Sequence, residues 1–214
     1  MKRILSLSLG LALGAGALFT AQTGAAAIIE YSVDINTASL VGNPSGPFSL
    51  DFQLNDGSGT GDANNTATIN NFTFGTGGAS GSPNLAGGAA GNLSGTITLT
   101  DTTPFNEFYQ TFNAGNSLSF DVILTLNSDA GPTPDSFSVA ILDNNLYNLP
   151  TTGIGDTFLM VNLGPTPSVT TGFSTSPAVT VSVSAVPEPV PMTWVSLGLV
   201  VFGLWRRIGV KLRS

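Results

Sequence analysis

The sequence contains no cysteine and no histidine, and charged residues make up only 9% of its 214 positions. The lack of thiols and imidazoles excludes structural disulfides, thiolate zinc sites and the usual base of a serine or threonine nucleophile. The charge content is far below the roughly 25% of an average soluble domain. We therefore expect no cofactor and no classical nucleophilic catalysis, and we interpret the protein as a non-enzyme.

Basic residues are also absent from the whole interior of the chain. All six lysines and arginines lie at the two ends, and the 13 acidic residues lie between them, from Glu30 to Glu188. Neutralising nucleic-acid phosphates requires lysine or arginine, and bidentate binding of a carboxylate or phosphate requires arginine. The interior therefore predicts no nucleic-acid partner, and its negative charge favours cations over anions.

Residues 1–27 have the three parts of a secretory signal peptide. Two basic residues follow Met1 and residues 4–19 are apolar. The small residues Ala25 and Ala27 occupy the −3 and −1 positions of a cleavage site before Ile28. This pattern predicts an N-terminal helix that enters the Sec translocon and is removed after export. An uncleaved N-terminal anchor is the alternative.

Residues 186–214 form a tail with three successive parts. A tripeptide comes first, the uncharged residues 190–205 follow, and residues 206–214 close the chain. The tripeptide is Pro187, Glu188 and Pro189, and the basic residues of the last part are Arg206, Arg207, Lys211 and Arg213. The apolar part predicts one transmembrane helix, because as a helix it is about 24 Å long, close to a hydrocarbon core of roughly 30 Å.

The basic residues set the expected orientation of this helix. Basic residues directly after an apolar run are typical of a stop-transfer sequence that stays cytoplasmic, which places the preceding domain outside. A buried core helix is the alternative for residues 190–205.

This order of a Pro-Glu-Pro motif, an apolar segment and a basic end resembles the PEP-CTERM sorting signal of exported proteins in Gram-negative bacteria. The resemblance implies that an exosortase, an integral-membrane cysteine transpeptidase, recognises the tail and removes it near Pro187. It also implies a protein anchored transiently in the inner membrane and then released to the cell surface or extracellular polysaccharide matrix. The prolines suit this role, because they keep the recognition site out of the helix that follows.

Between the two ends, apolar and polar residues alternate with the period of a β-strand. The alternating runs, which Gly-, Pro- and Asn-rich segments separate, are residues 29–35, 48–54, 67–74, 93–99, 118–126, 137–141, 158–163, 169–173 and 179–183. About nine or ten strands predict an all-β domain over residues 28–185, an antiparallel β-sandwich with a jelly-roll-like arrangement.

Two segments depart from simple alternation. Phe105, Phe108, Tyr109 and Phe112 have helical spacing, but Phe108 and Phe112 also alternate, so in an all-β chain we favour a strand over a short helix. The glycine-rich run 75–91 is expected to form a long loop. Stretches 50–55, 65–72 and 117–121 resemble a group of PEP-CTERM surface proteins, which implies the same β architecture and no particular site.

Acidic residues are the candidates for chemistry in the interior. Two suitably placed carboxyl groups can hydrolyse a glycoside, and Glu107 with Asp101 or Asp121 is such a candidate pair. Nothing in their spacing distinguishes these residues from acids that are simply solvated.

A cation site is the second possibility. Asp56, Ser58, Thr60 and Asp62 alternate through a glycine-rich loop and supply the hard oxygen ligands that Ca²⁺ takes. The glutamate that ends an EF-hand loop is missing, so an ordinary polar hairpin loop is favoured. Asp56 and Asp62 remain weak calcium candidates, and no metal site is predicted.

The sequence as a whole predicts an exported structural or interaction protein of the cell surface or matrix. A carbohydrate-binding or carbohydrate-active sandwich is the alternative. That alternative requires Tyr31, Tyr109, Tyr147 or phenylalanine rings exposed as a stacking platform.

Overall fold

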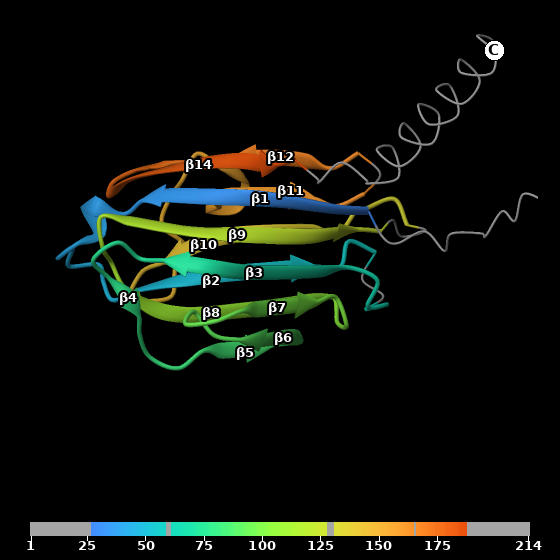
Figure 1. Cartoon of the computed structure of the whole chain (residues 1–214), viewed down its shortest axis with the longest axis horizontal. Helices are drawn as coiled ribbons and strands as arrows, with labels where there is room; N and C mark the ends of the chain where they lie inside the picture. Colours follow the sequence, from blue (N-terminus) through green and yellow to red (C-terminus); the bar gives the residue numbers. More distant parts are fainter. Residues whose placement is uncertain (1–26, 59–60, 128–130, 165, 188–214) are drawn as a thin grey trace, which may run out of the picture.

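The computed structural model describes residues 27–58, 61–127, 131–164 and 166–187, which form two antiparallel β-sheets packed face to face (Figure 1). Sheet A, in the order β13-β14-β1-β9-β3-β7-β6, consists of β1 (Ala27–Asn36), β3 (Thr66–Thr73), β6 (Gly88–Gly91), β7 (Ile97–Thr100), β9 (Ser117–Leu126), β13 (Ser174–Thr175) and β14 (Ala178–Val186). Sheet B has the order β12-β11-β10-β2-β8-β4, with β5 also paired to β8. Its strands are β2 (Phe48–Asn55), β4 (Gly78–Ala79), β5 (Asn84–Ala86), β8 (Phe105–Asn113), β10 (Ser136–Leu142), β11 (Leu159–Asn162) and β12 (Ser168–Thr171).

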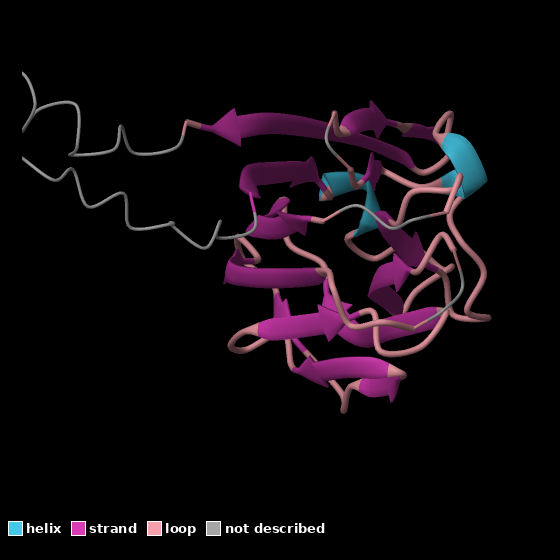
Figure 2. Ribbon diagram, turned by 90° about the vertical axis from the view of Figure 1, so that its right-hand side faces the viewer, coloured by secondary structure: helices cyan, strands magenta, loops and turns pink. Residues whose placement is uncertain are grey.

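The predicted all-β, antiparallel architecture is confirmed. Helical structure within the described ranges is limited to two short 3-10 turns, η1 (Ala38–Leu40) and η2 (Ile154–Asp156), drawn in cyan in Figure 2. The strand favoured over a helix at residues 105–112 is also confirmed, because this segment forms β8 with Phe108 and Phe112 buried.

The expected long loop at residues 75–91 is wrong. This run contains β4, β5 and β6, which pair with the edges of β8 and β7. Strand pairing uses backbone groups, so glycine and alanine can extend a sheet without any side-chain pattern to reveal it. The three short strands are the main reason why the described residues form fourteen strands where about nine or ten were expected.

The expected signal peptide and tail lie almost wholly outside the described residues. Ala27 already begins β1, and Val186 ends β14, so both strands reach past the expected domain limits of 28 and 185. Pro187 follows β14 directly, whereas Ala25, Glu188, Pro189, the apolar run 190–205 and the basic residues beyond it are not described. In the described part of the chain, no helix is long and apolar enough to cross a membrane.

Phenylalanine rings fill the space between the sheets. Phe52 of β2 lies at the centre, and its ring centroid is 5.3 Å from that of Phe120 on the facing sheet, in an edge-to-face arrangement. The rings of Phe72, Phe108 and Phe137 lie between 6.1 and 6.3 Å from the same centre. Such aromatic pairs stabilise by roughly 0.5–1.5 kcal/mol beyond the burial of their area.

A β-bulge in β3 decides which of its side chains reach this core. Asn70 pairs with Asp121 of β9, but the next pair joins Thr73 to Ser119, so two residues of β3 face one of β9. Asn71 in this irregular segment has a left-handed φ of 56°. Before the bulge the odd-numbered side chains of β3, such as Ile69, point into the core. The extra residue moves every later side chain to the opposite face, so after the bulge the even-numbered Phe72 points inward.

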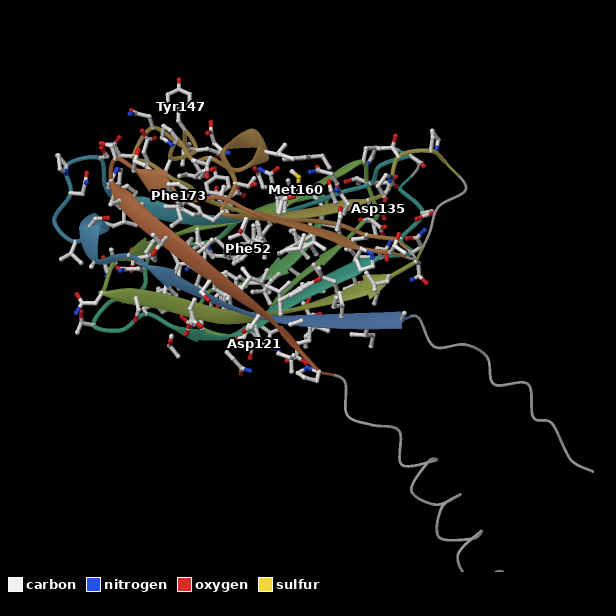
Figure 3. All side chains as sticks on the ribbon, turned by 90° about the horizontal axis from the view of Figure 1, so that it is seen from above. Phe52, Asp121, Asp135, Tyr147, Met160 and Phe173 are labelled. Atoms are coloured by element: carbon white, nitrogen blue, oxygen red, sulfur yellow. The ribbon has the colours of Figure 1, made fainter. Side chains whose placement is uncertain are left out.

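The sandwich has two ends with different contents. β1 begins and β14 ends at one end, the termini pole, where Glu30 of β1 pairs with Val186 of β14 (Figure 1). Asp135 lies at this same end, whereas Tyr147 and Phe173 lie toward the opposite end, the far pole (Figure 3). The two ends of the described domain are therefore neighbours in space.

The substitution Phe52→Ala should destabilise the domain by about 3–5 kcal/mol, because it removes the ring at the centre of the aromatic cluster and leaves a cavity. Urea unfolding followed by circular dichroism measures the loss. Phe105→Ala is the matched control, since the Phe105 side chain is 45% exposed. A similar loss of unfolding free energy in both variants would contradict the central role of Phe52.

Candidate functional site

The carboxylates of this domain are held without any cation from lysine or arginine, since none occurs between Arg3 and Arg206. Side-chain amides and backbone N–H groups donate hydrogen bonds to the carboxylates instead. The arrangement is clearest on the outer face of sheet B, where Gln53 of β2 lies opposite Glu107 of β8, and Asp51 lies opposite Tyr109.

Asp51 and Glu107 share one amide group. The Gln53 Nε2 atom donates to Asp51 Oδ2 at 2.9 Å and to Glu107 Oε1 at 3.3 Å. Asp51 is only 1% exposed, and its Oδ1 atom has no hydrogen-bond partner. Burial, reinforced by the charge of Glu107 and opposed by Gln53, raises the pKa of Asp51 to about 7. Burial also raises the pKa of Glu107.

This pair has the electrostatics of a general acid beside a carboxylate, but not its accessibility. A glycosidase needs both carboxyl groups to reach the scissile bond, and an acid that is 1% exposed has no such access. The expected partners of Glu107 are elsewhere. Asp121 is on the outer face of sheet A (Figure 3), and Asp101 is buried between β7 and β8.

A second group of buried acids ties together loops at the termini pole. The Asn65 backbone N–H donates to both carboxylate oxygens of Asp101, at 3.1 and 3.0 Å, and its Nδ2 atom donates to Asp135 Oδ2 at 2.7 Å. The Gly57 N–H donates to Asp135 Oδ1 at 2.8 Å. Burial raises the pKa of Asp101, while hydrogen bonds from Asn65 and with Asp135 oppose the rise.

The two weak calcium candidates differ in exposure and in their hydrogen-bond partners. Asp56 is buried and accepts a hydrogen bond from the Gly61 N–H, whereas Asp62 is exposed and accepts from the backbone and side chain of Asn64 at 3.2 and 2.9 Å. Thr60 lies outside the described ranges. Among the residues that the structure does describe, no group of three or more acidic side chains could hold a metal ion.

Carbohydrate binding through a stacking platform requires exposed aromatic rings, and of the three tyrosines only Tyr147 is exposed. Tyr31 is buried, and Tyr109 is half-buried on the outer face of sheet B. Tyr147 is 71% exposed at the far pole, and Phe173 is exposed on the same side of the molecule (Figure 3). The hydrogen bond from the Asn144 N–H to the Ser45 carbonyl, 2.9 Å, connects the Tyr147 loop to the turn before β2.

A cavity of about 560 Å³, the neutral pocket, opens beside the bulged half of β3. Strand β7 pairs only with residues 66–69 of β3, so no described strand lies beyond residues 70–73 on that side. The walls are Asn70, Asn71, Phe72 and Phe74 from β3 and its end, Ala79 of β4, and residues 93–96 of the turn between β6 and β7. None of these residues is ionisable, which distinguishes the pocket from both acidic groups.

Sequence reasoning did not identify Asp51, Gln53 or the pocket residues. The alternation in residues 48–54 does place Asp51 and Gln53 on one face of a strand, but it cannot show that this outer face is covered at Asp51. Asn70 and Asn71 were missed although the sequence carries a signal for the bulge, since the apolar positions change phase from Ala67 and Ile69 to Phe72 and Phe74 across this Asn-Asn pair. Comparison with known proteins adds no further assignment: no family model, curated protein or solved structure matches the chain.

The raised pKa of Asp51 makes the domain more stable in mild acid than in base. The folded state holds this proton up to a pH of about 7, whereas the unfolded chain releases it near 3.8, so stability falls as pH rises between these values. We expect Asp51→Asn to reduce this pH-dependent loss of unfolding free energy by roughly 2–4 kcal/mol. Urea unfolding at pH 5 and pH 8 measures the change for each variant.

Asp34→Asn is the control for this experiment, because it removes a carboxylate from an exposed position on β1. Glu107 and Asp101 contribute to the fall with the same sign and remain in both variants. An Asp51→Asn protein whose stability still fell as steeply as that of the parent chain would show that Asp51 is ionised in the fold.

Proposed function

We propose that the chain is an exported, non-enzymatic protein of the cell surface or extracellular matrix, delivered through the Sec translocon and sorted by an exosortase. The observation that carries the proposal is the ordered tail of Pro187-Glu188-Pro189, the apolar run 190–205 and the basic end 206–214. In this proposal residues 1–27 are the signal peptide, residues 190–205 form a transmembrane helix, and Arg206, Arg207, Lys211 and Arg213 stay cytoplasmic.

The geometry of the folded domain suits delivery from a membrane. β1 and β14 are adjacent, and the chain enters β1 and leaves β14 at the termini pole. Both flanking segments therefore connect to one end of the sandwich, and the far pole with Tyr147 faces away from them (Figure 3). A membrane at the termini pole leaves both outer sheet faces and the far pole free for contacts in the matrix.

A structural role is favoured over catalysis by the placement of the acids. The most strongly perturbed carboxyl group, Asp51, is enclosed, and Asp101 is fully buried among the loops of the termini pole. Asp101 connects neighbouring loops by hydrogen bonds, and Asp51 is bonded to Gln53 of its own strand, so neither faces a space that a substrate could enter. We propose further that the domain is jelly-roll-like, because the chain crosses between the sheets from β1 to β2 to β3 and from β7 through β8 and β9 to β10.

We retain the binding form of the carbohydrate alternative as a second candidate. The neutral pocket favours it, because half-buried phenylalanine rings, amides and hydroxyls are brought together there without an ionisable group. No pair of carboxyl groups faces this pocket, so the carbohydrate-active form has no counterpart in it.

Sorting predicts two cleavages that intact mass spectrometry can measure on protein recovered from the envelope and from the medium. The surface product should begin at Ile28 and should lack the tail from near Pro187 onward. The double variant Pro187→Ala, Pro189→Ala should retain the tail and accumulate in the membrane fraction, because the extended recognition site is lost.

Pro150→Ala is the matched control, since Pro150 is exposed and far from the tail in sequence. It should be processed like the parent protein. A surface product that still carries Lys211–Ser214 would refute processing by an exosortase, and it would leave membrane anchoring as the remaining explanation of the tail.

A further inference from the structure

We propose that the neutral pocket beside β3 is a binding site for an uncharged saccharide, such as a segment of a neutral polysaccharide. This inference rests on the second candidate function, carbohydrate binding, and is independent of how the tail is processed. Its volume of about 560 Å³ is within the range of small-molecule sites, which is roughly 300–1,000 Å³.

Some polar groups of the pocket lack hydrogen-bond partners among the described residues. The Asn70 Oδ1 atom is buried and accepts no hydrogen bond. A buried polar atom of this kind costs free energy unless something satisfies it. Asn70 lines the pocket, so a rotation of its side chain would present this acceptor to a ligand hydroxyl. The hydroxyls of Ser94 and Thr96 are exposed at the rim, and neither makes a hydrogen bond with another described residue. Amide and hydroxyl groups together match the alternating donors and acceptors of a sugar.

The apolar wall of the pocket suits the other face of a sugar ring. Phe72 and Phe74 are half-buried, and their rings lie 6.2 Å apart with an angle of 15° between their planes. Each ring packs against a buried phenylalanine of the core. The ring centroids of Phe72 and Phe120 are 5.6 Å apart, and those of Phe74 and Phe112 are 6.1 Å apart. Fixed aromatic rings provide apolar contact area at low entropic cost, and the C–H groups of a saccharide can pack against them.

The turn that closes the pocket is fixed in place before any ligand arrives. The Leu93 N–H donates to Gln110 Oε1 at 2.9 Å, and the Gln110 Nε2 atom in turn donates to the carbonyls of Ser80 and Gly81. The Ser94 N–H donates to Asn92 Oδ1 at 2.9 Å. Asn71 is also tied down, because its Nδ2 atom donates to Asp121 Oδ2 at 2.8 Å. A preorganised site loses less entropy on binding.

The open edge of β3 could in principle receive a peptide strand, but its geometry favours a saccharide. The bulge interrupts the regular spacing of backbone hydrogen-bonding groups between Asn70 and Thr73. Asn71 has a left-handed φ, so the backbone is not extended there as strand pairing requires. A bulged edge of this kind protects against strand addition rather than promoting it. The absence of ionisable residues from the walls further selects an uncharged ligand over an acidic polymer.

Affinity electrophoresis of the full chain, exported and purified in detergent, tests the proposal. Native gels containing dextran, galactomannan or a mixed-linkage β-glucan should retard the protein in at least one case, and gels containing alginate should not. Gly95→Trp should weaken the retardation about tenfold or more by filling the pocket mouth. A Cβ atom at Gly95 meets only Asn92 Oδ1, at 4.0 Å, so this variant should fold normally.

Ala38→Trp is the matched control, since it adds the same exposed ring at a different hollow, on the outer face of sheet A. It should leave the retardation unchanged, and both variants should unfold at the urea concentration of the parent. The proposal is overturned if none of the three neutral polysaccharides retards the protein, or if Gly95→Trp and Ala38→Trp behave alike. It is equally overturned if an extended peptide binds at the pocket and the polysaccharides do not. A failure of tail processing, read by mass, leaves this assay unaffected.

Discussion

The packing of Phe52 against phenylalanine rings from both sheets is the contact on which the rest of the fold depends. The chain has no cysteine to cross-link the layers, so side-chain packing holds them together. Phe108 and Phe137 flank Phe52 within sheet B, while Phe72 and Phe120 meet it from sheet A. Because Phe72 belongs to the bulged part of β3, the same cluster that closes the core also positions the wall of the neutral pocket.

A second constraint is that the interior of the chain offers no positively charged side chain to its carboxylates. Amides take this role: Gln53 joins Asp51 to Glu107, Asn65 joins Asp101 to Asp135, and Asn71 holds Asp121. An amide donates hydrogen bonds but carries no charge, so it lowers the pKa of a carboxyl group less than an arginine does. At Asp51, Asp101 and Glu107 the effect of burial outweighs these hydrogen bonds, and the pKa of each carboxyl group is raised.

Side-chain alternation was sufficient to predict the long strands, and it failed where backbone geometry decides the structure. Leu118 to Leu124 of β9 and Phe137 to Ile141 of β10 follow the expected pattern, because their inward faces are apolar throughout. The Gly- and Ala-rich strands β4 to β6 have no such pattern, since they are short edge strands that contribute little to the core. The candidate site was only partly open to prediction, because the pocket depends on where β7 stops and where β3 bulges. The change of apolar positions from Ile69 to Phe72 marks the bulge in the sequence, but the end of β7 has no signature in side-chain polarity.

The pairing of β1 with β14 also determines how the domain would carry a mechanical load. If the chain is anchored through the residues after Val186 and pulled at the far pole, the force acts along β14 and against β1. That force loads the β1–β14 pairing in shear. It is shared by all seven residue pairs, from Glu30–Val186 to Asn36–Thr180. A strand held at its opposite end would instead peel away one pair at a time. With β1 as its antiparallel neighbour, β14 would therefore resist shear if the chain were anchored through the residues that follow it.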